Sequence, residues 1–271
     1  ASALGLTLVL AATAHAQTAA PASDSQTDNL SEVIVTGAPY AVSLDSATTH
    51  VDVLNTDAIL RTTPTGLGDV LDHIPGLRNS QHGPGAARPI IRGLSGPRVM
   101  LLQNGTGLVD VSALSADHAV VADPAMASRI EVLRGPSTLA YGGSAIGGGV
   151  NVIDDRIPST PADDALDGYA SGSWTSNGDG RAGSVFRKTG QGPFVFTGDG
   201  TRRDIDEYEA GSNPVSADYA AANGLTPLTD RHVPNSDLEL NAYGAGLSFI
   251  GSRGFIGVSA KQTRSGYGVP Y

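Results

Sequence analysis

Beyond about Pro161, apolar and polar positions alternate along the chain with a period of two. Such alternation is typical of strands that bury one face of a sheet and expose the other. Turns rich in Gly, Asn and Asp separate the alternating runs, and one long polar segment, about 203–237, interrupts them. The pattern predicts antiparallel strands over 168–174, 181–186, 193–199, 238–250 and 255–262.

Short turns combined with one long polar loop are typical of β-barrels of the bacterial outer membrane. A soluble β-sandwich has the same period of two, so the alternation alone leaves both folds open. The start of the chain favours the barrel. Apolar residues 4–12 are too few for a membrane-spanning helix, and the small-x-small pattern Ala-His-Ala follows them. We therefore expect residues 1–16 to be a signal peptide without its charged front, which implies export through the Sec route.

Between about 41 and 155 the pattern changes to short helix and strand signals in alternation. Thr65 is a plausible cap for a helix over 66–73, which an Ile-Pro-Gly sequence then ends. A stretch of roughly 115 residues is long enough for a core of its own, so we expect a small α/β domain here. Its further predicted elements are helices at 58–60 and 125–128 and strands at 89–93, 98–102, 130–133 and 150–153, with a turn at Asn104-Gly105.

Composition narrows the range of functions. The 271 residues include 27 acidic and 17 basic ones, and the acidic excess without a basic cluster argues against nucleic-acid binding. The absence of cysteine excludes disulfide frameworks and Cys-based zinc modules. Glycines at 142–143 and 147–149 lack the features of a phosphate cradle, so we expect no nucleotide site. No Ser-His-Asp or paired-carboxylate constellation is apparent, and we expect neither enzymatic activity nor a resident cofactor.

Motifs in order from residue 67 to residue 153 resemble the plug domain of TonB-dependent outer-membrane receptors. Each motif alone is weak, and Asn104 stands where an Asp is usual. The motifs are Leu67-Gly68-Asp69-Val70-Leu71 with Ile74-Pro75-Gly76, Ile91-Arg92-Gly93 with Arg98-Val99, Leu101-Leu102-Gln103-Asn104-Gly105, Ile130-Glu131-Val132-Leu133-Arg134-Gly135-Pro136, Tyr141-Gly142, and Ala145-Ile146-Gly147-Gly148-Gly149-Val150-Asn151-Val152-Ile153.

The resemblance implies an α+β plug domain followed by antiparallel strands of an incomplete transmembrane β-barrel. A plugged barrel of about 22 strands needs roughly 200–240 residues for its strands alone. Only 271 − 160 = 111 residues follow residue 160. We therefore expect the front part of a longer receptor, inactive in transport by itself. The implied division is 1–16 signal peptide, 17–40 linker and TonB box, 41–158 plug domain, and 159–271 first barrel strands.

A short extended segment after the predicted signal peptide resembles a TonB box, the energy-coupling element of these receptors. A segment of this kind on a flexible linker can add a strand to a partner's sheet. An ordinary edge strand is the alternative. The implied partners are TonB with its inner-membrane energising complex, and the lipid of the Gram-negative outer membrane. The residues are Glu32, Val33, Ile34, Val35, Thr36 and Gly37.

Four charged residues of the plug motifs are candidates for a latch that holds a removable plug in the barrel. Arginine forks can bind carboxylates of the barrel wall through two hydrogen bonds. Solvated surface charge is the alternative and the commoner fate of arginine. The candidates are Arg92, Arg98 and Arg134, with Glu131 beside the last of them.

Segments 88–94 and 152–158 resemble the receptors of this family that are linked to zinc uptake. Within that resemblance, Asp117 and His118 match residues that bind metal at the plug apex. Imidazole and carboxylate suit Zn²⁺, although a turn cap and a surface histidine would explain the same residues. His82 and His232 are weaker candidates.

These observations predict a TonB-dependent receptor for a scarce metal, with Zn²⁺ as the transported ligand. A ferric siderophore or haem is the alternative ligand. A secreted β-rich binding module and an exported hydrolase are alternatives of other classes.

Overall fold

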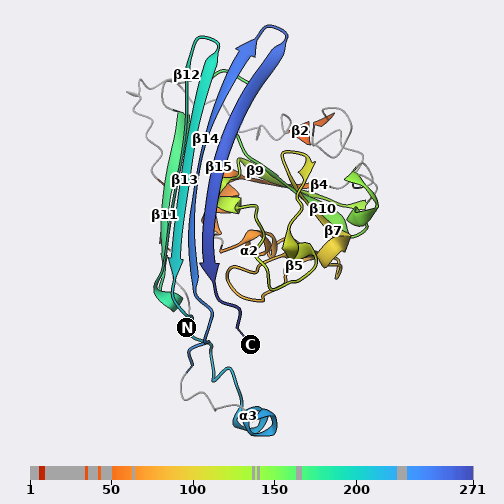
Figure 1. Cartoon of the computed structure of the whole chain (residues 1–271), viewed down its shortest axis with the longest axis vertical. Helices are drawn as coiled ribbons and strands as arrows, with labels where there is room; N and C mark the ends of the chain where they lie inside the picture. Colours follow the sequence, from red (N-terminus) through yellow and green to blue (C-terminus); the bar gives the residue numbers. More distant parts are fainter. Residues whose placement is uncertain are drawn as a thin grey trace, which may run out of the picture.

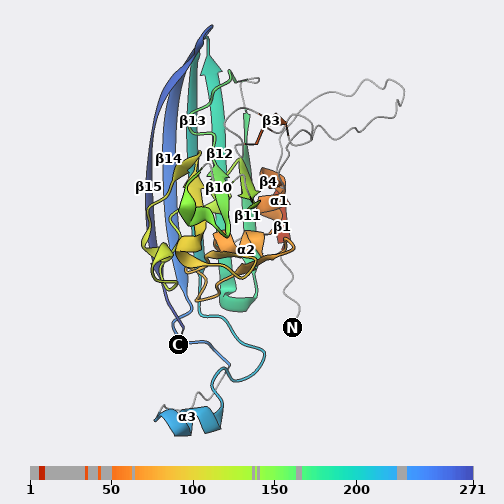
Figure 2. The same cartoon turned by 90° about the vertical axis from the view of Figure 1, so that its right-hand side faces the viewer.

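The computed structural model describes residues 6–9, 34–35, 42–43, 51–62, 65–135, 138, 141–162, 167–224 and 231–270. Figure 1 shows a tall, curved sheet and, beside it, a more compact α/β domain. In the view of Figure 2, the α/β domain lies in front of the strands, so the two views place it against one face of the sheet. None of the helices in the described ranges is both long and apolar enough to cross a membrane.

The tall sheet is antiparallel, with the strand order β1-β11-β12-β13-β14-β15. Its strands are longer than the sequence pattern predicts, because the main-chain ladder continues through residues that break the alternation. β1 lies within the predicted signal peptide, most of which is outside the described residues, and cleavage stays a prediction. The strands are β1 (Leu6–Val9), β11 (Asp167–Thr175), β12 (Gly180–Gln191), β13 (Phe194–Ile205), β14 (Leu238–Gly251) and β15 (Gly254–Tyr267).

The two ends of the tall sheet differ. Two-residue turns at 192–193 and 252–253 join the strands at one end, at the top of Figure 1. At the other end lie η8 (Asn177–Asp179) and the long connection 206–237, which carries α3 (Ala217–Asn223). We call these the short-turn end and the loop end.

The α/β domain contains a five-stranded sheet of order β4-β9-β10-β7-β8, in which only β10 and β7 run parallel. Its apolar core includes Ile59, Leu71, Ile130 and Val150, all fully buried. The elements are β4 (Val51–Asn55), α1 (Thr56–Arg61), α2 (Leu67–Leu71), β5 (Leu77–Asn79), β6 (Pro89–Ile91), η3 (Gly96–Arg98), β7 (Val99–Gln103), β8 (Thr106–Gly107), η4 (Val111–Ala113), η5 (Pro124–Met126), β9 (Arg129–Leu133), η7 (Gly143–Ala145) and β10 (Gly148–Ile153).

Local sequence explains where several of these elements begin and turn. The α2 helix is capped by Gly66, whose amide donates to the Asp69 carboxylate at 3.0 Å, while the Thr65 hydroxyl donates to the same oxygen. Asn104 and Gly105 have φ of 51° and 78°, as the predicted tight turn between two strands requires.

Candidate functional site

Asp117 and His118 lie on the exposed loop that follows η4. The Ser115 hydroxyl donates to Asp117 Oδ1, which lies 3.1 Å from His118 Nδ1. The Ser115 contact, and then that of His118, hold the pKa of the Asp117 carboxyl below its ordinary value. An ionised carboxylate can only accept a hydrogen bond, so a neutral His118 that donates to it from Nδ1 would leave the Nε2 lone pair open to a cation. The pair can therefore offer two donors to a cation.

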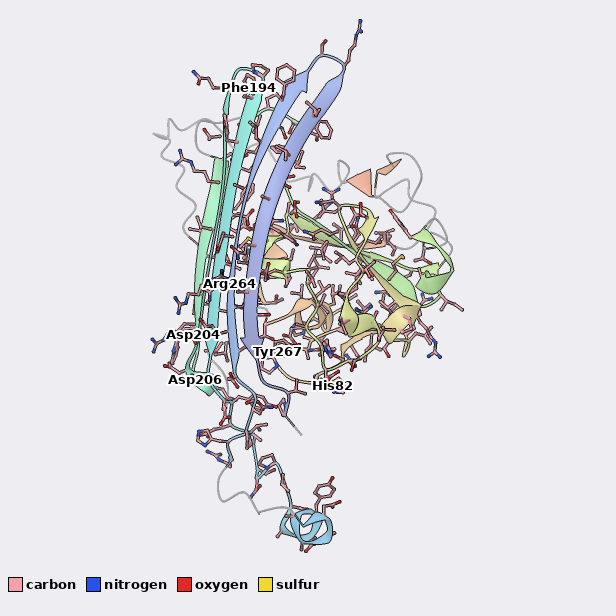
Figure 3. All side chains as sticks on the ribbon, in the orientation of Figure 1. His82, Phe194, Asp204, Asp206, Arg264 and Tyr267 are labelled. Atoms are coloured by element: carbon pink, nitrogen blue, oxygen red, sulfur yellow. The ribbon has the colours of Figure 1, made fainter. Side chains whose placement is uncertain are left out.

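Directly after this pair, the chain lines a cavity of about 190 Å³ between the α/β domain and the tall sheet. The amide of Ala119 donates to the hydroxyl of Tyr267 at 2.9 Å. Figure 3 shows Tyr267 at the loop end of β15. The cavity is mainly apolar, with hydroxyls from Thr263 and Ser265 among its polar groups. The predicted metal pair and this cavity therefore lie close to the loop end.

Two buried ion pairs join the α/β domain to β13. The Arg156 guanidinium binds both carboxylate oxygens of Asp199, at 2.6 Å from Nε and 3.2 Å from Nη2. Arg203 Nη2 lies 2.7 Å from Asp123 Oδ1. None of the four side chains is more than 7% exposed. Because removing one partner of such a pair costs about 3–5 kcal/mol, the pairs fix the position of the domain on the strands.

The face of the tall sheet turned away from the α/β domain is apolar at the short-turn end. The Phe194 and Phe249 rings meet edge to face at 5.3 Å, and each side chain is more than 40% exposed. This exposed surface continues with Phe196 on β13 and with Ile256 and Val258 on β15. Charged residues replace them toward the loop end, where Arg202, Asp204, Glu239 and Arg264 point the same way.

Residues 43–149 match the family model of the TonB-dependent receptor plug domain. The matched residues cover most of the α/β domain, which we therefore call the plug domain. The predicted fold class is thereby confirmed, since the tall sheet that follows resembles part of the barrel of such receptors.

Solved structures with the same fold include a copper transporter, OprC, and two iron-chelate receptors. OprC is 18% identical with a TM-score of 0.63, and the match covers 81% of this chain and 31% of that one. The ferric-catecholate import receptor Fiu of E. coli K12 is 19% identical (TM-score 0.57; 81% and 27% covered). A ferric enterobactin receptor of Pseudomonas aeruginosa, PfeA, is 16% identical (TM-score 0.55; 81% and 34% covered). The chain thus spans about a third of the length of the structures it matches.

Two of the four predicted latch residues, Arg134 and Glu131, make contacts within the plug domain. Arg134 Nη2 lies 2.6 Å from Asp52 on β4, within the plug domain. Glu131 is buried and accepts from Arg129 Nε at 2.9 Å, also within the plug domain. Glu131 lies on β9, between β4 and β10 in the central sheet, and Arg134 directly follows that strand.

Arg92 is exposed at a turn and Arg98 at the end of η3, and among the described residues neither side chain forms a hydrogen bond or ion pair with the tall sheet. The contacts with β13 come instead from Asp123 and Arg156. The sequence did contain a signal for the two residues of β13 that form these ion pairs. Asp199 and Arg203 stand at alternate positions of β13 that face inward, where isolated charges need partners.

The weaker metal candidates lie apart from one another. His82 is exposed in a plug loop at the same end as Tyr267 (Figure 3). His232 lies in the long connection, with Nε2 3.6 Å from Glu209 Oε1, beside an open cavity of about 680 Å³. Within the described ranges, no group of three or more His, Asp and Glu side chains is arranged to hold a metal ion. Asp117 and His118 are thus a pair of donors without a third in these ranges.

Two residues of the predicted TonB box, Ile34 and Val35, form β2 and pair with β3 (Val42–Ser43). The other four, Glu32, Val33, Thr36 and Gly37, lie outside the described residues. Figures 1 and 2 show β2 and β3 on the side of the plug domain nearer the short-turn end.

Proposed function

We propose that this chain belongs to a TonB-dependent receptor of the Gram-negative outer membrane that imports a scarce metal, and that this metal is zinc. The observation that carries the proposal is a plug domain attached by a few buried ion pairs to the inner face of long antiparallel strands. Those strands have an apolar outer face suited to lipid. Such contacts hold a domain in place and still allow it to be pulled away.

The arrangement of the ends supports the direction of transport. Outer-membrane barrels have short turns toward the periplasm and longer loops outside. β2, part of the predicted TonB box, lies nearer the short-turn end, where a periplasmic TonB with its inner-membrane complex could pair with it. Asp117 and His118 lie near the loop end, where a ligand from outside would arrive.

Zinc is supported by the donor set. A neutral imidazole and a carboxylate are ligands that Zn²⁺ takes readily, and Asp117 both orients His118 and neutralises cation charge. Further donors would come from loops outside the described residues or from water. An incomplete protein coordination suits a transported ion, which has to leave again.

The test is zinc uptake by cells that carry the full-length gene product, with and without TonB. We expect TonB-dependent uptake that falls, with zinc affinity down at least about tenfold, in Asp117→Ala and His118→Ala. His73→Ala is the matched control, because His73 is another exposed plug histidine and follows α2. Unchanged affinity in both variants would exclude this zinc site.

An iron chelate is the second candidate ligand. Two of the solved receptors with this fold are named for ferric catecholate and ferric enterobactin. The open cavity of about 680 Å³ at the loop end could admit part of such a molecule. Growth rescue by a ferric siderophore or haem, and not by zinc, would favour this candidate.

A further inference from the structure

Residues Arg156 and Ile157, just after the last plug strand, lie in a slot on the inner face of the tall sheet. A Cβ atom at Gly246 of β14 would overlap the carbonyl oxygen of Arg156. One at Gly244 would lie 2.6 Å from Arg156 Nε, and one at Gly257 of β15 would overlap the side chain of Ile157. The slot therefore exists because three adjoining positions are glycines, which have no side chains to fill it.

The slot also binds the main chain and the charge of Arg156. The Thr197 hydroxyl of β13 donates to the Arg156 carbonyl oxygen at 2.7 Å. The guanidinium binds Asp199 through two nitrogens and Asp154 through a third, at 2.5 Å. Three adjacent strands thus bind the main chain of Arg156, pair its charge and leave space for it at one point.

The contacts made farther upstream in the plug domain are simpler. Arg203 holds Asp123 through one oxygen, and the other carboxylate oxygen is buried without a hydrogen-bond partner among the described atoms. The amide of Ala119 holds Tyr267 by one hydrogen bond. Gly85 packs directly on the Tyr267 side chain without a polar contact at that point.

The position of the slot along the chain gives it a role in plug movement. A pull on the TonB box side reaches β4 and the helices first and reaches Arg156 last. We propose that the slot is a fixed pivot, which keeps residues 156–157 on the strands while the upstream plug domain separates from them. This inference rests on the proposed TonB-coupled function.

Two disulfide tethers of matched design test the pivot in the full-length gene product, since this chain itself has no cysteine. The first joins Ile157→Cys to Gly257→Cys, and the second joins Gly85→Cys to Tyr267→Cys. In both pairs, a Cβ on the glycine would lie against the partner side chain on or beside β15. The readout is TonB-dependent uptake before and after reduction.

We expect the oxidised 157–257 tether to leave uptake unchanged, because the residues it joins stay together. The 85–267 tether should abolish uptake until it is reduced. Loss of uptake with the 157–257 tether, or full uptake with the oxidised 85–267 tether, would overturn the pivot. Absence of TonB-dependent uptake in the untethered parent would instead count against the proposed function.

A second measurement does not depend on transport. Gly246→Ala should displace residues 156–157 and lower the urea concentration at which a protease reaches the plug domain in outer-membrane vesicles. Gly198→Ala on β13 is the control, because a Cβ there meets no atom within 4 Å. If the protease reached the plug domain at the same urea concentration in both variants, the proposed role of the slot would be wrong.

Discussion

Arg88 is a buried charge that holds the start of the loop carrying Asp117 and His118. Its guanidinium lies 3.3 Å from Asp110, donates to the Ser112 hydroxyl, and donates to the Val99 carbonyl oxygen at 2.9 Å. Burial lowers the pKa of Arg88, and the neighbouring Asp110 opposes this. A guanidinium keeps its proton in proteins, so the charge persists and has to be met by these partners. The loop that carries the exposed pair Asp117 and His118 is therefore fixed at its start by the contacts of Arg88.

Asp69 gives the plug domain a pH dependence. Burial raises the pKa of its carboxyl above the ordinary 3.8, against hydrogen bonds from Gly66, Asn79 and Thr65 that lower it. At a pH above the folded pKa, both the folded and unfolded chains carry the carboxylate, and the full cost of burying it is present. As the pH falls through the folded pKa, the folded chain takes up the proton first, so the Asp69 contribution to the free energy of unfolding rises.

We therefore expect Asp69→Asn to remove this contribution. Urea unfolding of the chain between neutral pH and about pH 4 measures it. As the pH falls, the free energy of unfolding of the parent should rise relative to that of the variant. A difference that stays constant would contradict the assignment.

The individual charges were the least predictable part of the sequence. Motif order correctly indicated a plug domain, but it did not contain the contacts of Arg134 with Asp52 and of Glu131 with Arg129. A motif records which residues a fold uses, whereas the partner of a charge depends on which strand lies beside it. The contacts of Arg156 with β13 are made by Asp199 and Thr197, more than 40 positions away, and no local pattern contains them.

At the scale of single elements, the turn between β7 and β8 depends on backbone conformation. Gly105 has φ of 78°, and a Cβ there would meet no atom within 4 Å. We expect Gly105→Ala to destabilise the chain by about 1–2 kcal/mol, entirely through the cost of the left-handed backbone. Urea unfolding measures it. Gly143→Ala is the control, because its site is equally open and its φ is not in the left-handed region.

Elements with a clear periodicity were found, and those without one were missed. The period of two located all five strands from β11 to β15, although it ended β12, β13 and β15 too early. β4 was missed, since a strand of five residues beside a helix start leaves too short a pattern. Its pairing with β9 stabilises it, and that contact is remote in sequence.

At the scale of the whole molecule, the outward face of the tall sheet divides into an apolar and a charged region. Leu247 lies between Phe249 and Ala245 on that face of β14, and Glu239 lies on the same face near the loop end. Arg187 also faces outward, opposite Gly198 of β13 and Gly168 of β11.

If lipid covers the apolar region, Leu247→Arg should destabilise the receptor by up to about 2–4 kcal/mol, the cost of an arginine near the bilayer midplane. Glu239→Arg, outside the apolar region, should have little effect. The folded fraction in bilayers, read from unfolding in urea, distinguishes the two. Equal effects of the two variants would count against a lipid-facing surface.

β13 presents one acid and one base to the plug domain, and the plug domain presents the opposite charges in return. A plug domain grafted from another receptor would meet Asp199 and Arg203 with charges of its own. Unless it brought a base and an acid to the same two points, it would bury unpaired charges at about 3–5 kcal/mol each. The charges of the plug domain and of β13 are therefore matched, and a chimera should assemble only when its plug domain and its β13 carry opposite charges at these two points.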